Sequence, residues 1–77
     1  MRGQSEHTYT VILEPERDGG FHAFCPVLKG CHTQGDTLEE ALQNMREAID
    51  LYLESLLDHG EPIPVEDIFI KPVTVRA

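Results

Sequence analysis

The sequence predicts a small α+β domain in the order β-β-β-α-β, with an antiparallel sheet that has one face covered by a long amphipathic helix. Three observations support this class. Apolar and polar residues alternate in short segments before residue 35, which is typical of strands. Apolar residues then recur at steps of three and four from Leu38 to Leu56, which is typical of a helix. Asp18-Gly19 between two alternating segments is typical of a hairpin turn.

Three strands are expected before the helix. The first spans residues 7–14 and ends at Pro15, the second spans residues 21–25 and ends at Pro26, and the third is a brief segment over residues 31–34. Alternation places one set of apolar side chains of the first two strands on a common inward face. This set is Tyr9, Val11, Leu13, Phe21, Ala23 and Cys25.

The helix has a marked beginning and a marked end. Thr37 followed by Glu40 is a capping box, in which each side chain accepts a hydrogen bond from a backbone amide at the helix start. Gly60 supplies a left-handed stop, and Pro62 prevents the helix from restarting. The apolar stripe consists of Leu38, Ala41, Leu42, Met45, Ile49, Tyr52, Leu53 and Leu56, and the opposite face carries Glu39, Gln43, Arg46, Glu47, Asp50 and Glu54.

The C-terminal part of the chain is rich in apolar, β-branched residues and predicts a last strand. Pro72 lacks an amide donor, which places this strand at a sheet edge. Unpaired edges favour strand addition, and Leu51 and Leu57 lie outside the helix stripe, so we expect a homo-oligomer, either a dimer or a tetramer. The expected oligomer interface consists of Leu51, Leu57, Ile68, Ile70, Val73 and Val75.

Length and composition indicate one domain. Residues 1–6 are expected to be a flexible N-terminal tail and residues 7–77 a single domain without a separate DNA-binding domain. Two cysteines, no signal-peptide pattern and no long apolar run predict a cytoplasmic protein that does not enter a membrane. The formal net charge of −8 argues against direct nucleic-acid binding by the main surface. This acidic charge is explained either by a need for solubility or by complementarity to a basic partner.

The residues do not predict a catalytic, metal or cofactor site. The histidines and cysteines lack metal-binding spacings such as C-x-x-C or H-E-x-x-H. Cys31 and His32 are neighbours in a strand and point to opposite faces, so they cannot form a nucleophile–base pair. Carboxylates at the helix start are explained by capping and by the helix dipole. Physical reasoning from the residues therefore ends at an acidic, oligomerising module.

A longer pattern resembles the HicB family, the antitoxins of HicA–HicB toxin–antitoxin systems. Gly30 to Leu42 carries G-C-x-T-x-G-D-T-x-E-E-A-L, and Gly60 to Pro64 matches the ending G-x-x-I-P. Upstream, Asp18-Gly19-Gly20 and Phe21-His22-Ala23 match the hairpin and the aromatic-x-A strand. The resemblance extends from His7 to Pro64 and implies a degenerate ribonuclease-H-like fold without catalytic carboxylates.

The resemblance also implies a partner, a small basic HicA-type ribonuclease that cleaves messenger RNA. Complementary charge makes an acidic inhibitor of such an enzyme physically reasonable. The expected partner-binding residues, chosen by charge and exposure, are Glu39, Glu47, Asp50, Glu54, His22 and His32. The alternative is a structural or regulatory oligomer of the same fold that has no toxin partner.

Overall fold

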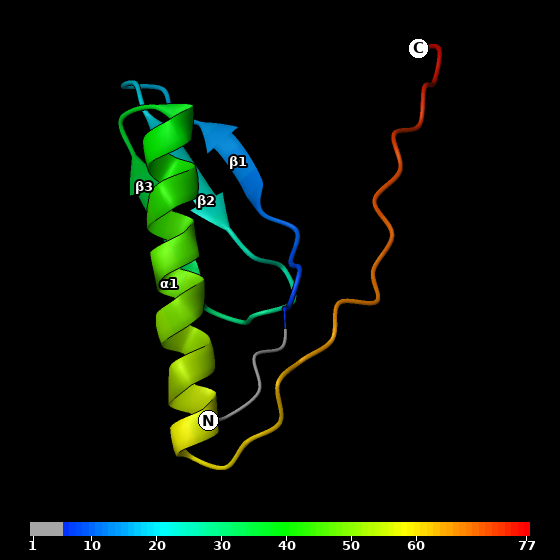
Figure 1. Ribbon diagram of the computed structural model, residues 1–77. Coiled ribbons are helices and arrows are strands. Elements are labelled where there is room, and N and C mark those ends of the chain that lie inside the picture. Colours follow the sequence, from blue (N-terminus) through cyan, green and yellow to red (C-terminus); the bar gives the residue numbers. More distant parts are fainter. Residues whose placement is uncertain (1–5) are drawn as a thin grey trace.

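The structure is a computed structural model that describes residues 6–77. Strands β1 (Ile12–Pro15), β2 (Phe21–Phe24) and β3 (His32–Gly35) form an antiparallel sheet in the order β1-β2-β3, followed by helix α1 (Leu38–Asp58) (Figure 1). The α+β class is confirmed. The expected N-terminal tail, residues 1–6, lies outside the described residues except for Glu6.

Strand β1 begins later than the sequence predicted. The register pairs Ile12 with Phe24, which places Val11 opposite Cys25 and then Thr10 opposite Pro26. Pro26 has no amide to donate, and the ladder stops there. The predicted alternation still holds in this segment, because Tyr9, Val11 and Leu13 all pack against the core.

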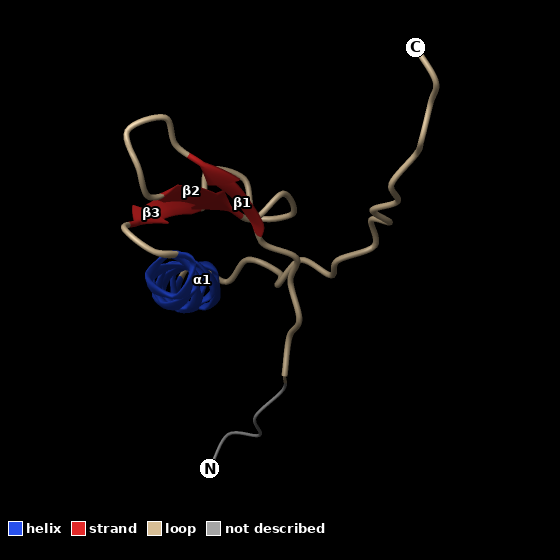
Figure 2. Ribbon diagram, turned by 90° about the horizontal axis from the view of Figure 1, so that it is seen from above, coloured by secondary structure: helices blue, strands red, loops and turns tan. Residues whose placement is uncertain are grey.

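The core is small and lies between the helix and two of the three strands. Helix α1 contacts β3 and β2, and Figure 2 shows it lying under these strands with β1 to the side. The fully buried side chains are Ala23, Cys25, Leu28, Cys31, Ala41 and Met45. The predicted apolar stripe is therefore only partly buried: Ile49, Tyr52 and Leu53 are half-buried, and Leu42 is exposed.

Gly35 allows the sheet and the helix to meet closely. A Cβ atom at this position would lie 2.5 Å from the backbone nitrogen of Ala41 and 2.8 Å from its Cα atom. Both contacts are with backbone, which cannot move aside without shifting the helix. Asn44 adds a polar contact from the next turn, because its side-chain amide donates to the Gln34 carbonyl at 2.9 Å.

The helix ends are largely as predicted. The Thr37 hydroxyl accepts from the Glu40 amide at 3.0 Å. The Glu40 carboxylate accepts from the amide of Asp36 at 2.6 Å, one residue before the amide expected for a capping box. Gly60 has a φ of +67°, the left-handed conformation expected at a helix stop.

The predicted last strand is absent from the structure. Within the described part of the chain, residues 61–77 contain no helix or strand. A strand requires a neighbouring strand for its backbone hydrogen bonds. Figure 1 shows the chain passing the N-terminal segment and then leaving the body, so residues 68–75 have no such neighbour within their own chain.

The helix cap provides a first test. Replacing Thr37 by Ala removes the acceptor for the Glu40 amide, and we expect the free energy of unfolding to fall by about 1 kcal/mol. Urea denaturation at one fixed protein concentration measures this change. Ser55→Ala is the matched control, because Ser55 is an exposed helix residue whose hydroxyl makes no hydrogen bond in the structure. Equal stability of the two variants would contradict the capping role.

Candidate partner-binding surfaces

The six residues predicted to bind a partner lie on two opposite sides of the molecule. Glu39, Glu47, Asp50 and Glu54 are exposed on the side of α1 that faces away from the sheet. His22 and His32 lie on the side of the sheet that faces away from the helix, since their neighbours Ala23 and Cys31 are buried beneath α1. The sheet and the helix separate these groups, so the prediction describes two surfaces.

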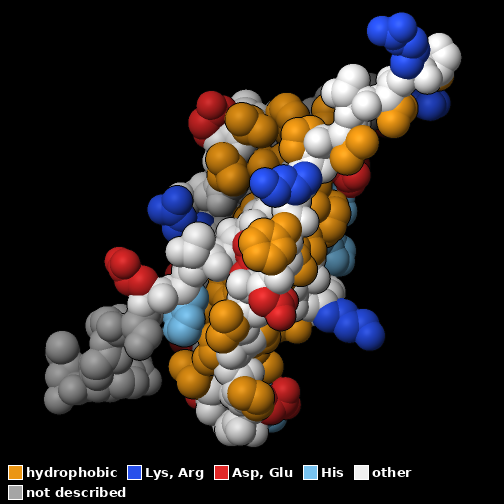
Figure 3. Space-filling view, turned by 90° about the vertical axis from the view of Figure 1, so that its right-hand side faces the viewer, with side chains coloured by type: hydrophobic (Ala, Val, Ile, Leu, Met, Phe, Trp, Pro, Cys, Tyr) orange, Lys and Arg blue, Asp and Glu red, His pale blue; other side chains and the backbone are white. Residues whose placement is uncertain are grey.

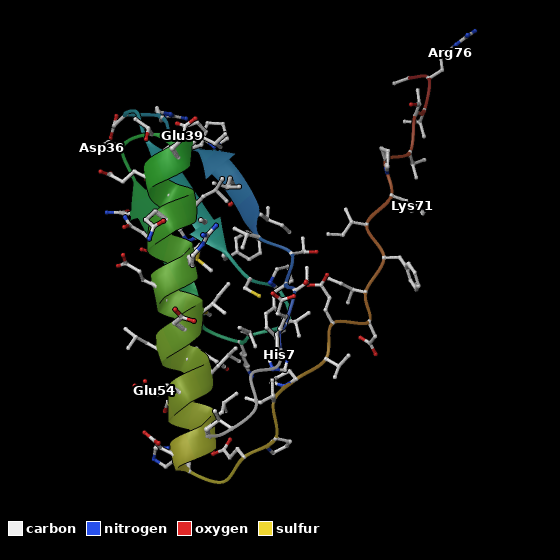
Figure 4. The ribbon with its side chains drawn as sticks, viewed as in Figure 1. His7, Asp36, Glu39, Glu54, Lys71 and Arg76 are labelled. Carbon is white, nitrogen blue, oxygen red and sulfur yellow. The ribbon has the colours of Figure 1, made fainter. Side chains whose placement is uncertain are left out.

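The acidic helix face, defined by Glu39, Glu47, Asp50 and Glu54, is a strip along α1. In Figure 4 Glu39 lies near the start of the helix and Glu54 toward its end. Across residues 6–77 no Lys or Arg side chain forms an ion pair with these carboxylates. Among the same residues, the side-chain hydrogen bond that reaches the strip is a long one, 3.4 Å from Gln43 to Glu47. The charge on this strip is therefore free to attract cations.

The outer sheet face brings the two histidines together. The ring centroids of His22 and His32 are 5.5 Å apart, and the His22 ring stacks on Phe24 at 5.8 Å. Nδ1 of His22 also lies 3.6 Å from a carboxylate oxygen of Glu14. Phe24 also lies on this surface, because the strand alternation points its side chain outward. It is not among the residues that the sequence predicted to bind a partner. A shallow hollow of about 500 Å³ adjoins these rings.

A groove runs between residues 7–11, which precede β1, and helix α1. It encloses about 610 Å³, and no residue of β1 lines it. Its apolar lining comes from Tyr9, Val11, Leu42, Met45, Ile49 and Leu53, and Arg46 and Asp50 stand at its helix side. Periodicity alone could not reveal this groove, since it depends on where the helix crosses the sheet.

Two hydrogen-bonded contacts, here called the clamp, hold the chain after the helix against the N-terminal segment. The Tyr9 hydroxyl donates to the Pro64 carbonyl at 2.5 Å. The Glu66 carboxylate accepts from the Thr10 amide at 2.5 Å and from the Thr10 hydroxyl at 2.6 Å. These bonds lower the pKa of Glu66. The sequence carried no signal for the clamp, because its partners are more than fifty residues apart.

Comparison with known proteins assigns the family. A family model described as the HicB-like antitoxin of bacterial toxin–antitoxin systems matches residues 9–73. The chain belongs to the HicB-like antitoxin family. It is 61% identical over 69 residues to a UPF0150 protein of Synechocystis, covering 90% of this chain and 87% of that relative. A UPF0150 protein of Thermoplasma acidophilum is 46% identical over 69 residues, covering 90% and 97% of the two chains.

The two cysteines of this HicB-like chain belong to its hydrophobic core. Cys25 and Cys31 are free and buried, as the alternation predicted, and burial raises the pKa of the Cys31 thiol. Among residues 6–77 no group of three or more His, Cys, Asp or Glu side chains is placed to hold a metal ion. The same part of the chain has no helix of the length and hydropathy that crossing a bilayer requires.

The residues expected at an oligomer interface are all exposed, but they form two groups. Leu51 and Leu57 lie on α1, whereas Ile68, Ile70, Val73 and Val75 lie on the C-terminal part of the chain beyond the clamp. Phe69 is the most exposed of the large apolar residues, at 89%, and belongs with the second group. Exposure alone does not say which group meets a partner.

The clamp yields a prediction about the titration of Glu66. Its lowered pKa means that the clamp stabilises the fold above the ordinary carboxyl range, and that this stabilisation is lost as the pH falls through the lowered value. In Thr10→Val the hydroxyl donor is gone, so we expect the Glu66 pKa to rise toward its ordinary value, as followed by carbon-13 NMR. Thr8→Val changes an exposed neighbour and should leave the titration unchanged. An unaltered Glu66 titration in Thr10→Val would contradict the assignment.

Proposed function

We propose that this chain is an antitoxin that binds and neutralises a small basic HicA-type ribonuclease and is not itself an enzyme. The observation that carries the proposal is the acidic helix face, a strip of four exposed carboxylates without a cationic partner in residues 6–77. Because the chain belongs to an antitoxin family, the partner expected at that strip is a toxin. A toxin whose basic RNA-binding surface docked there would bind these carboxylates in place of its RNA.

The non-catalytic part of the proposal rests on how the carboxylates are arranged. Those of the acidic helix face follow one another along the outside of α1 and do not converge on a cleft. Metal-dependent nucleases require carboxylates from several elements that point into one open site. The exposed strip suits recognition of an extended basic surface better than catalysis at one point.

The histidines of the outer sheet face are proposed as a second, separate contact. His22 and His32 together with Phe24 offer flat rings that can stack on a partner. This contact lies on the other side of the sheet from the acidic helix face. A small partner that binds one of these surfaces does not reach the other. Variants of the two surfaces therefore have to be tested separately.

The direct experiment is co-expression with the small basic protein encoded by the neighbouring reading frame. We expect the two chains to co-purify and the complex to lose the partner's RNA-cleaving activity. Failure to co-purify, or the absence of such a neighbour, would contradict the antitoxin proposal. The second candidate function, a stand-alone structural or regulatory oligomer, would then be favoured by the exposed apolar residues beyond the clamp.

Charge reversal tests whether the acidic helix face makes the contact. We expect Glu47→Lys combined with Glu54→Lys to weaken toxin binding by about tenfold or more, because a basic partner is then repelled. Calorimetry at low and at moderate salt measures the change. The control combines Glu16→Lys with Glu61→Lys, which alters the net charge equally at exposed positions outside the acidic helix face.

The comparison between these two double variants decides the site. Loss of binding in the helix variant alone supports the acidic helix face. Equal loss in both would mean that net charge, and no particular surface, attracts the toxin. Unchanged binding in both would remove the acidic helix face from the proposal and direct attention to His22 and His32.

A further inference from the structure

The outer sheet face holds a pair of histidines that come from neighbouring strands. The register sets Phe24 of β2 opposite His32 of β3, so His22 is the diagonal neighbour of His32 on the same face. Their ring centroids are 5.5 Å apart, and the ring planes are tilted by 56°. The sequence predicted no metal site because it lacks the local spacings typical of metal ligands. A pair formed across two strands has no such spacing.

The separation of the two rings suits a metal ion held between them. Two imidazoles bound to one tetrahedral zinc ion have ring centres roughly 5 Å apart, because each Zn–N bond is about 2.0–2.1 Å long. The observed 5.5 Å is close to this value, so small side-chain rotations bring one nitrogen of each ring to the ion. Imidazole suits zinc, nickel and copper, whereas magnesium and calcium prefer oxygen ligands. The pair therefore favours a divalent transition-metal ion.

Glu14 is placed to orient one of the two rings. It pairs with His22 across β1 and β2, and its Oε1 atom lies 3.6 Å from Nδ1 of His22. This contact is longer than a hydrogen bond, but a carboxylate on that side of the ring favours a proton on Nδ1 and leaves the lone pair on Nε2. Carboxylates commonly hold metal-binding histidines in this way and make them more basic ligands. Nε2 of His22 is therefore the nitrogen expected to bind the ion.

The surroundings of the pair leave room for a hydrated ion. The hollow of about 500 Å³ beside the rings has space for the water molecules that complete the coordination of such an ion. Lys29 also lines this hollow and disfavours a cation, whereas Glu14 and the formal net charge of −8 favour one. Histidine side chains are exposed at the surface in Figure 3, where Lys and Arg side chains lie scattered. The balance of charge therefore favours a cation.

The protein supplies two ligands at this place. Cys25 and Cys31 line the same hollow, but their side chains are buried in the core, at 2% and 6% exposure. Within residues 6–77 no group of three His, Cys, Asp or Glu side chains is placed to hold a metal ion, so the histidine pair has no third protein ligand there. Two protein ligands make an open site, which leaves coordination positions for water or for a donor atom of a bound partner.

We propose that His22 and His32 bind a divalent ion of the zinc, nickel and copper class, with Glu14 as the positioning residue for His22. Water completes the coordination when the chain is alone. The site lies on the outer sheet face, so it is separate from the acidic helix face. The inference does not rest on the antitoxin proposal, because metal binding is a property of the isolated chain.

The first experiment titrates the purified full chain with zinc chloride, nickel chloride or magnesium chloride, each alone, by isothermal calorimetry. We expect one zinc or nickel ion per chain and no saturable binding of magnesium at the same concentrations. His22→Gln combined with His32→Gln should lose this binding, with an unchanged circular dichroism spectrum because neither side chain is buried. The matched control, His7→Gln combined with His59→Gln, removes two exposed histidines elsewhere and should keep it. Loss in both double variants, loss in neither, or a wild-type chain that binds no zinc overturns the proposal.

The second experiment tests the positioning role of Glu14. We expect Glu14→Gln to weaken zinc binding by about tenfold to a hundredfold, the range found when the partner of a ligating histidine is removed. Glu16→Gln is the matched control, because it removes the same charge at an exposed position in the turn after β1. Nitrogen-15 NMR of the His22 ring reports which nitrogen carries the proton, a readout that a change of net charge alone would not move. Equal loss of affinity in the two variants with an unchanged tautomer would remove Glu14 from the site. Because no toxin is present, each of these results leaves the antitoxin proposal to be decided by co-purification.

Discussion

The close approach of Gly35 to Ala41 determines how the sheet and the helix are joined. A side chain at residue 35 would meet the backbone of α1, so the absence of a Cβ atom lets the helix begin directly against the end of β3. The Thr37 cap and the Asn44 contact to Gln34 then hold the first turns in that position. Because the helix starts beside β3, it continues across β3 and β2 and buries Ala41 and Met45 against them.

The same placement leaves part of the domain uncovered. Strand β1 lies to the side of the helix, and the half-buried residues Tyr9, Val11 and Leu13 mark the border of the core. A chain of 77 residues buries little apolar surface, and the open groove between residues 7–11 and α1 leaves this core smaller still. The clamp lies along this border, whereas the C-terminal segment, residues 68–77, leaves the body beyond it.

The groove and the acidic helix face are different surfaces of the molecule. The groove lies between residues 7–11 and α1, whereas Glu47 and Glu54 lie on the outside of α1. Asp50 belongs to both surfaces, because it is part of the acidic helix face and also lines the groove.

Local chemistry in the sequence determined the elements and the family. Apolar periodicity, the Thr37–Glu40 pair, the glycine stop and the Gly30–Leu42 motif each depend on residues a few positions apart, and they correctly predicted three strands, one helix and HicB-like membership. They also predicted that the candidate site residues lie on exposed faces of the helix and the sheet. Only the tertiary structure decided that the sheet and the helix separate the acids from the histidines, that an open groove lies between residues 7–11 and α1, and that residues 68–75 form no strand in their own chain. These outcomes depend on where the helix crosses the sheet and on contacts such as Thr10 with Glu66, whose residues are distant in the sequence and meet only when the chain is packed.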